Sequence, residues 1–469
     1  MKLSRSGGPL FLAASLFLLG PWLRPATAQL LGPEFQVNSY TSYNQNLPAV
    51  AATGSGNFVV TWSSDLQDGS NLGVYGQRFN PAGSPLGSEF QVNTYTTSYQ
   101  LNPAVTALGS GEFVVVWESY GQDRPASFGV FGQRFDSAGV PVGSEFQVNT
   151  YTTNDQRSSA VAADSSGNFV VLWSSRDNGT SDGVFGQRFS SAGSKVGSEF
   201  QVNTYTTNDQ GRPAVAADGP GSFLVVWESY GQDGSDKGVF GQRFNSAGST
   251  VGSEFRVNSY TTSDQDGPAV AVDGTGNFVV AWTSAGQVSA YSFGVFGQRY
   301  SSAGSPVGSE FQVNTDTLSN HRYPAVAADA PGNFIVAWTS YDQDGRGVFG
   351  QSFDSAGSKV GGELRVNTYA TGSQAFPAVA ADGLGNFVVS WQSDGQDGSL
   401  YGVFGQRMTP PVFQHGFEAN PPFWSATTAT MCLGHCGAAS PDGCFCDSFC
   451  LTNFDCCLDA CSTCGQCVP

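Results

Sequence analysis

The stretch that decides the fold runs from Pro213 to Asn258 and reads PAVAADGPGSFLVVWESYGQDGSDKGVFGQRFNSAGSTVGSEFRVN. Four short segments in it have strand character, namely 213–217, 223–227, 239–244 and 254–258. Glycine, Asp and Asn stand at the junctions, where tight turns need them. No window spaces apolar residues as a helix does, so the pattern predicts an all-β fold.

The four segments differ in the way expected for strands at different depths. Segment 254–258 alternates polar and apolar residues, as a half-exposed strand does. Segment 223–227 is an unbroken apolar run, which predicts cover on both faces. Segment 213–217 carries small side chains, as expected where strands crowd near a central axis. The order from axis to rim therefore follows the order in the chain, which is the arrangement of a β-propeller blade.

The pattern occurs seven times in the chain. Each copy closes its second segment with a tryptophan: Trp62, Trp117, Trp173, Trp227, Trp282, Trp338 and Trp391. The outer segment is out of phase, because a first one at 34–38 precedes every innermost segment and none follows the last third segment at 402–408. We therefore predict a closed seven-bladed ring over residues 34–408, in which segment 34–38 completes the last blade. The alternative, an open solenoid, would expose strand edges or need end caps.

Two repeated features are predicted to be structural. The seven tryptophans end buried segments and should pack between blades. The Gln-Arg pair of the third segment, as in Gln133-Arg134, is too regular to be one active site. We expect its arginine to hydrogen-bond between blades or to acidic loops, and Ser352 replaces it in one copy.

Charge and the N-terminal stretch predict an extracellular protein. Residues 1–28 have the form of a signal peptide, with Lys2 and Arg5, the apolar run 10–19 and a small-x-small end at 26–28. The alternative, a membrane anchor, is disfavoured because the run is short, and no other segment has the length to cross a membrane. The chain has 38 acidic and 20 basic residues, and this excess disfavours nucleic acid and anionic membranes as partners.

The candidate binding surface is the face formed by two sets of loops, those between the second and third segments and those that lead into each innermost segment. Carboxylates, amides and tyrosines recur there and could bind Ca²⁺ through oxygen atoms, or bind sugars by hydrogen bonding and stacking. The alternative is that they form Asx turns that satisfy their own backbone. The candidates are Asp68, Tyr120, Gln122, Asp123, Asp155, Asp209, Tyr230, Gln232, Asp233, Asp264, Tyr341, Asp344 and Asp397.

No motif singles out a reaction. The chain has no HExxH, G-x-S-x-G or P-loop pattern. Copy five breaks the repeat at 286–291, and copy six carries His321-Arg322-Tyr323, an unusual cluster but one without a paired nucleophile. No cofactor is predicted other than possible calcium.

The composition changes after residue 408. A linker at 409–431 contains Pro410-Pro411, and Phe413–Glu418 with Trp424 resembles the F-x-D-G-F-E…W segment of many secreted bacterial proteins, with His415 at the Asp position. All ten cysteines lie in the following module, 432–469, with the spacing C-x3-C-x7-C-x-C-x3-C-x5-CC, which resembles the somatomedin B domain.

That resemblance implies a disulfide-rich, protein-binding module. It implies the pairs Cys432–Cys446, Cys436–Cys464, Cys444–Cys457 and Cys450–Cys456, with Cys461–Cys467 as an additional bridge. Cys461 and Cys464 could exchange roles, and the tyrosine of the family pattern is Ala460 here.

These observations together predict a secreted, non-catalytic binding or adhesion protein. It would recognise a glycan or protein through many weak contacts on the loop face, and a protein through the cysteine-rich tail. Two alternatives remain: an extracellular polysaccharide lyase or hydrolase with its site on the same face, and a structural surface or matrix protein.

Overall fold

The computed structural model describes residues 29–409, except 110, 177, 178, 180, 291, 343, 344, 383 and 384. The predicted signal peptide, linker and cysteine-rich module lie outside the described residues, and so does Asp344. The described part of the chain contains no helix long and apolar enough to span a membrane.

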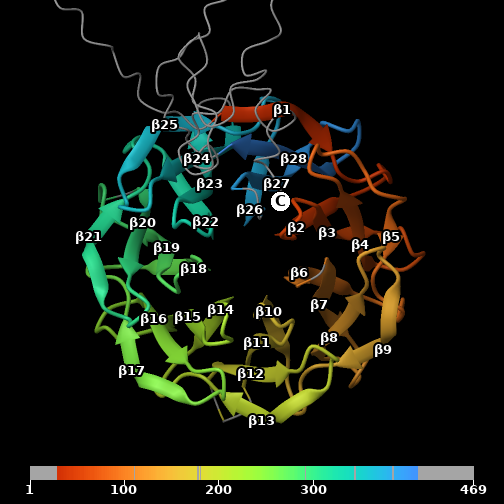
Figure 1. The fold of residues 1–469 in the computed structure, drawn as a ribbon, viewed down its shortest axis with the longest axis horizontal. Helices are drawn as coiled ribbons and strands as arrows, with labels where there is room; N and C mark the ends of the chain where they lie inside the picture. The colour runs from red at the N-terminus through yellow and green to blue at the C-terminus, as the bar shows by residue number, and fades with distance from the viewer. Residues whose placement is uncertain are drawn as a thin grey trace, which may run out of the picture. The chain divides into compact units, whose positions relative to one another are not determined.

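The described residues form seven antiparallel four-stranded sheets arranged as blades around an axis (Figure 1). From blade 1 to blade 7, the inner strands are β2 (Gln45–Ala52), β6 (Gln100–Leu108), β10 (Gln156–Ala163), β14 (Gln210–Ala217), β18 (Gln265–Val272), β22 (Asn320–Ala328) and β26 (Gln374–Ala381). The second strands are β3 (Phe58–Asp65), β7 (Glu112–Tyr120), β11 (Phe169–Ser175), β15 (Phe223–Tyr230), β19 (Phe278–Ala285), β23 (Phe334–Asp342) and β27 (Phe387–Asp394).

The other two sets lie toward the rim. The third strands are β4 (Leu72–Phe79), β8 (Phe128–Phe135), β12 (Gly183–Phe189), β16 (Lys237–Phe244), β20 (Phe293–Tyr300), β24 (Gly345–Phe353) and β28 (Tyr401–Thr409). The outer strands are β5 (Phe90–Gln91), β9 (Pro141–Gln147), β13 (Lys195–Gln201), β17 (Thr250–Arg256), β21 (Pro306–Gln312), β25 (Lys359–Arg365) and β1 (Gln29–Gln36). The predicted all-β, seven-bladed propeller is therefore confirmed.

The two ends of the described chain close the ring within blade 7. Strand β1 pairs antiparallel with β28, with Phe35 opposite Gly405 and Gln36 opposite Phe404. The predicted closure by the first strand is correct, although pairing starts earlier than residue 34, at Gln29 opposite Thr409. Closure gives β28 a partner on its outer edge, so blade 7 has four strands like the other six blades.

The core lies between blades, as predicted from the tryptophans. All seven of these side chains have no exposed surface. Trp173 of blade 3, for example, shares an apolar cluster with Val114 and Val116 of blade 2. Each blade therefore completes its core only with its neighbour, which is the usual stabilising principle of repeat folds.

Glycines in the third strands make room for two bulky groups. A Cβ at Gly129 would lie 2.4 Å from an oxygen of Asp123, and one at Gly132 would lie 2.8 Å from the ring of Phe146. The repeated GVFG sequence is therefore explained by close packing of the carboxylate and the aromatic ring against the backbone.

In six blades an arginine follows the GVFGQ or GVYGQ sequence and joins adjacent blades, as predicted. Arg134 donates from Nη1 to the carbonyl of Ala192 at 2.9 Å, and Arg243 donates to the carbonyl of Ala303 at 2.6 Å. In blade 6 the corresponding Ser352 is buried instead.

Candidate functional site

The loops that connect second to third strands, and those that connect an outer strand to the next inner strand, lie on one face of the ring. We call it the loop face. Each inner strand begins at the loop face and each second strand ends there, because these two strands run antiparallel in every blade. All described candidate ligand residues belong to this face.

Gln122 and Gln232 take part in contacts that repeat around the ring. Gln122 donates from Nε2 to Oε1 of Glu145 at 2.5 Å, and Oε2 of that glutamate accepts from the backbone N of Thr94 in the preceding blade at 2.6 Å. Gln232 donates to Glu254 in the same way. These amides therefore help to hold one blade to the next.

The aspartates of the second-to-third loops form Asx turns, which was the alternative to ligand binding. Oδ1 of Asp68, Asp233 and Asp397 accepts from the backbone N two residues later, at 3.0, 3.2 and 3.2 Å. Asp123 accepts from Nδ2 of Asn149 at 3.3 Å, and burial raises the pKa of its carboxyl group. Ligand binding by these four aspartates stays a prediction.

The three candidate tyrosines have different surroundings. Tyr120 packs edge-on against Phe128, with ring centroids 5.0 Å apart. The guanidinium of Arg346 lies 4.6 Å from the ring centre of Tyr341. Tyr230 is 46% exposed, which leaves its ring open to solvent.

The aspartates that lead into the inner strands also contact the backbone or neighbouring side chains. Asp155 accepts from the backbone N of Phe128 at 3.0 Å and pairs with Arg157. Asp209 accepts from the backbone N of Asp182 at 2.9 Å. Asp264 accepts from the backbone N of Ala285 through its own carbonyl, at 2.8 Å.

A set of residues that the sequence analysis did not select lies at the loop-face end of the inner strands. Two adjacent residues there, which we call the axial pair, differ in every blade, although the flanking Gln or His and Ala-Val hardly change. Aligning the seven copies would have revealed them. The axial pairs are Asn46-Leu47, Leu101-Asn102, Arg157-Ser158, Gly211-Arg212, Asp266-Gly267, Arg322-Tyr323 and Ala375-Phe376.

Each axial pair lies at an irregularity of strand pairing and has unusual backbone geometry. The register shifts just after its first residue in every inner strand, as between Asp266 and Ala269. Its second residue has a positive φ in every blade, including Arg212 at 47°, Tyr323 at 57° and Phe376 at 55°. Side chains of this kind are strained there, and such strain clusters at functional sites.

The preceding blade supports this geometry. At five axial pairs the residue after the buried tryptophan of the preceding blade accepts from the backbone N of the second residue. Glu118, for example, accepts from that of Ser158 at 2.8 Å, and Thr339 accepts from that of Phe376 at 3.1 Å. The backbone at the axial pairs is therefore fixed by tertiary contacts, which leaves the side chains free to vary.

The axial pairs of blades 4 to 6 gather charged groups around two carboxylates. Glu228, which is 8% exposed, lies 2.9 Å from Nζ of Lys237 and 3.9 Å from Nε of Arg212. It also accepts from the backbone N of Gly267 at 3.3 Å. This brings Glu228 beside Asp266, the other residue of that axial pair.

Asp266 has a perturbed acidity. Burial raises the pKa of its carboxyl group, and the negative charge of Glu228 raises this pKa further. Lys237, Arg212 and Arg322 act in the opposite direction but do not cancel the effect. A carboxyl group with a raised pKa next to a second carboxylate is a candidate for proton transfer.

In blade 6 the cluster His321-Arg322-Tyr323 contains one buried residue, His321, and one partly exposed aromatic residue, Tyr323. His321 is 1% exposed and stands where most blades have a buried glutamine; its Nδ1 accepts from Nε1 of Trp338 at 3.2 Å. Burial lowers the pKa of His321, which favours the neutral imidazole. Tyr323, by contrast, lies against Phe376 with ring centroids 4.5 Å apart, and both side chains are partly exposed.

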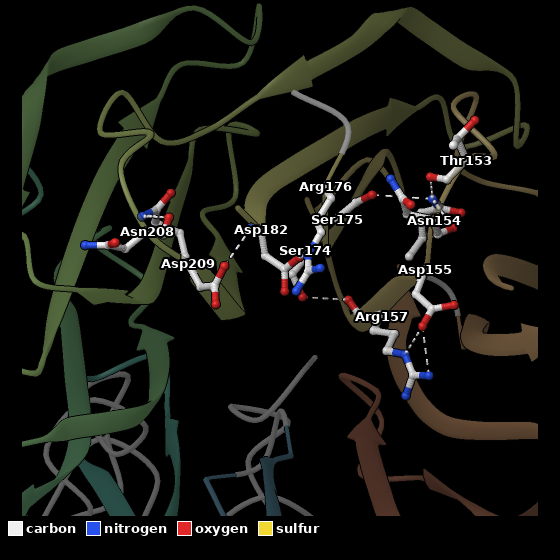
Figure 2. A network of polar contacts seen from close by, with 12 residues as sticks. Thr153, Asn154, Asp155, Arg157, Ser174, Ser175, Arg176, Asp182, Asn208 and Asp209 are labelled. Carbon is white, nitrogen blue, oxygen red and sulfur yellow. Dashed lines mark hydrogen bonds and ion pairs between the residues drawn. The ribbon is translucent and has the colours of Figure 1, made fainter. Parts of the chain in front are cut away.

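A cleft of about 690 Å³ lies between blades 2 and 3 on the loop face. Three arginines line it, Arg124, Arg157 and Arg176, together with Asp155 and Asp182. Figure 2 shows Arg157 paired with Asp155 on one side, and Arg176 near Asp182 on the other. Of the predicted ligand residues, only Asp155 lines this cleft.

The residues that the structure describes include no group of three or more His, Cys, Asp or Glu side chains placed to hold a metal ion.

No protein-family model matches the chain, and no curated protein matches it in sequence. Among solved structures, a protein of unknown function from Dyadobacter fermentans is 10% identical with a TM-score of 0.52; the match covers 82% of this chain and 99% of that one. An ulvan lyase, from a polysaccharide lyase family and bound to -[GlcA(1-4)Rha3S]-, is 10% identical with a TM-score of 0.50, covering 79% of this chain and 95% of that one.

The comparison contradicts the prediction of a non-catalytic binding protein. The ulvan lyase, a solved structure similar to this fold, is an enzyme that acts on a polysaccharide, so the enzyme alternative is better supported. At 10% identity the likeness itself shows the fold alone, and the chemistry must come from the residues of this chain.

Proposed function

We propose that the chain is an extracellular polysaccharide lyase that acts on an acidic, uronate-containing chain at the loop-face end of the inner strands. The observation that carries this proposal is the pair Asp266 and Glu228, set among Arg212, Lys237 and Arg322. These groups come from three adjacent blades: Arg212, Asp266 and Arg322 belong to axial pairs that no other blade repeats, Glu228 contacts two of these pairs, and Lys237 pairs with Glu228.

The cations suit a uronate substrate. Beta-elimination requires removal of a proton from the carbon beside the sugar's carboxyl group, and positive charge near that carboxylate stabilises the resulting anion. Arg212 and Arg322 belong to axial pairs and can supply this charge from either side of Asp266. The ulvan lyase with this fold is bound to a GlcA-containing oligosaccharide, which supports a substrate of this class.

Asp266 is assigned the proton transfer. Its carboxylate takes the proton from the carbon beside the uronate carboxyl group, and the electron pair of that bond forms the new carbon–carbon double bond. The bond to the glycosidic oxygen then breaks, and the departing oxygen receives the proton from Asp266. A raised pKa serves both halves, because it makes the carboxylate a stronger base and keeps the acid protonated nearer to neutral pH.

Glu228 is assigned a positioning role. Lys237 holds it at 2.9 Å, and its charge contributes to the raised pKa of Asp266. The same two carboxylates favour a second candidate, a glycoside hydrolase in which Asp266 donates the proton and Glu228 activates water.

Incubation of the purified chain with uronate-containing polysaccharides tests the proposal. We expect products that carry the ultraviolet absorbance of an unsaturated uronide, whereas new reducing ends without this absorbance would identify the hydrolase. Asp266→Asn should lower kcat at least about 100-fold, the typical contribution of a positioned acid–base group. The matched control is Asp273→Asn, in the turn that follows the same strand β18 at its other end, which should keep activity close to that of the unchanged protein.

The pH profile separates catalysis from a structural role of the carboxylate pair. Glu228→Gln removes a negative charge beside Asp266 and lowers the pKa of that carboxyl group. The acidic limb of the kcat profile should therefore move to lower pH. Full activity in Asp266→Asn, or an unmoved profile in Glu228→Gln, contradicts the assignment.

A further inference from the structure

The cleft between blades 2 and 3 has the size and lining of a ligand site. Its volume of about 690 Å³ is within the range of ligand pockets, roughly 300–1,000 Å³. It is lined by side chains from both loop sets and reaches the axial pair Arg157-Ser158. The cleft therefore adjoins the ring of axial residues but lies apart from Asp266, in blade 5.

The charge of the cleft lining is opposite in sign to the net charge of the chain. Three arginines face two carboxylates, in a protein whose net charge is −18. Arg157 pairs with Asp155 at 3.0 Å and Arg176 pairs with Asp182 at 2.8 Å. Arg124 has no ion-pair partner among the described residues, and the side chains that line the cleft carry one more positive than negative charge.

Both ion pairs are exposed to solvent, so a ligand anion can replace the aspartate in each of them. The side chains of Arg157 and Asp155 are 50% and 42% exposed, and those of Arg176 and Asp182 are 53% and 39% exposed. Exposed pairs of this kind contribute little to stability, so a ligand anion can compete with the aspartates for the guanidinium groups. The guanidinium of Arg157 lies 4.1 Å from the ring centre of Phe128, which holds it in place before a ligand arrives.

The wall of the cleft contains one buried hydroxyl without a partner. Ser127 lines the cleft and is 6% exposed, yet its Oγ has no hydrogen-bond partner among the described residues. Buried polar groups are normally satisfied, and Ser127 is the one residue of the cleft lining whose side chain keeps an unpartnered buried polar atom.

We propose that this cleft is a subsite for an acidic saccharide unit, one that carries a carboxylate or a sulfate group. The acidic group binds Arg124, with Arg157 and Arg176 on either side. The saccharide nature of the ligand rests on the proposed function, whereas the preference for a negative charge comes from the cleft itself.

Binding in the Asp266→Asn protein, where turnover is expected to be blocked, tests the subsite. Calorimetry compares three oligosaccharides of equal length: one that contains glucuronate, one neutral but sulfated, and one neutral. We expect tighter binding of an acidic oligosaccharide than of the neutral one, and the better acidic ligand identifies the preferred group. Adding Arg124→Ala should raise its Kd about tenfold, the effect of one charge-assisted hydrogen bond.

Two further variants make the result specific. Arg256→Ala removes the same charge from the outer strand β17 and should leave the Kd unchanged. Asp155→Asn removes the internal competitor of Arg157 and should tighten binding a few-fold, which a merely structural role of Asp155 does not predict.

The outcomes separate the subsite from the proposed function. Equal binding of neutral and acidic oligosaccharides, no measurable binding, or equal losses in Arg124→Ala and Arg256→Ala would overturn the subsite. If Asp266→Asn abolishes turnover while Arg124→Ala leaves the Kd unchanged, the subsite is wrong and the proposed function stands. If Arg124→Ala weakens binding although Asp266→Asn still turns over substrate, the subsite stands and the assigned proton transfer is wrong.

Discussion

Gln156 and Arg157 are neighbours in the chain, yet they belong to two different parts of the molecule. Gln156 is fully buried, accepts from Nδ2 of Asn149 at 3.1 Å, and has a counterpart with the same contact in most other blades. Arg157 is half exposed, and the corresponding residues of the other blades range from Leu101 to Asp266. The difference shows that one buried, repeated frame holds a ring of side chains that vary from blade to blade.

This separation has a physical basis. The frame fixes the backbone at the axial pairs through contacts from the preceding blade, such as Glu118 to Ser158. Substitutions of axial side chains therefore change the free energy of unfolding little. The axial side chains can thus carry chemistry that a strictly repeated blade cannot. The predictions below test this division.

The largest effect on stability is expected in the frame. Trp282→Ala empties a fully buried position between blades 4 and 5 and should lower the free energy of unfolding by about 3–5 kcal/mol. Leu400→Ala, at a 52% exposed position, should stay within about 0.5 kcal/mol. Denaturant unfolding measures both, and similar losses in the two variants would contradict the location of the core.

Two glycines provide a smaller and more direct comparison. A Cβ at Gly129 of the frame would meet Asp123 at 2.4 Å, whereas a Cβ at Gly211 of an axial pair would meet its nearest neighbour, Ser174, at 4.0 Å. Gly129→Ala should therefore cost about 1–3 kcal/mol, and Gly211→Ala about 0.5 kcal/mol or less. Equal changes in melting temperature for the two variants would contradict the distinction between the buried frame and the axial pairs.

The smallest effect is the pH dependence that Asp266 contributes. Because its pKa is raised on folding, the folded state binds its proton more tightly than the unfolded state does. Its contribution to stability is therefore fully present below the ordinary pKa of Asp and is lost as the pH rises through the raised value. Asp266→Asn should gain melting temperature relative to the unchanged protein as the pH rises through this window. A difference that does not change with pH would contradict the raised pKa.

The sequence predicted the frame well because its signals are local and repeated. The phase of the outer strands, with a spare segment before the first blade, was enough to predict the pairing of Phe35 with β28. The unbroken apolar run before each tryptophan was enough to predict a core between blades.

The same reasoning did not find the tertiary contacts of the loop residues, because exposed polar residues in loops look alike in sequence. Gln122 seemed free to bind a ligand, but its partner Glu145 is 23 residues away, and that glutamate reaches Thr94, 51 residues earlier. The axial pairs were overlooked because each is only two residues long and resembles no motif.

The amino-acid sequence by itself determined the number of blades, their strand order and the way the ring closes, since each depends on spacing and alternation along the chain. Only the tertiary structure brought Glu228 and Asp266 of adjacent blades together and gathered Arg124, Arg157 and Arg176 around one cleft. The reason is that acidity and binding depend on burial and on charges nearby in space, and these are set when the blades pack around a common axis.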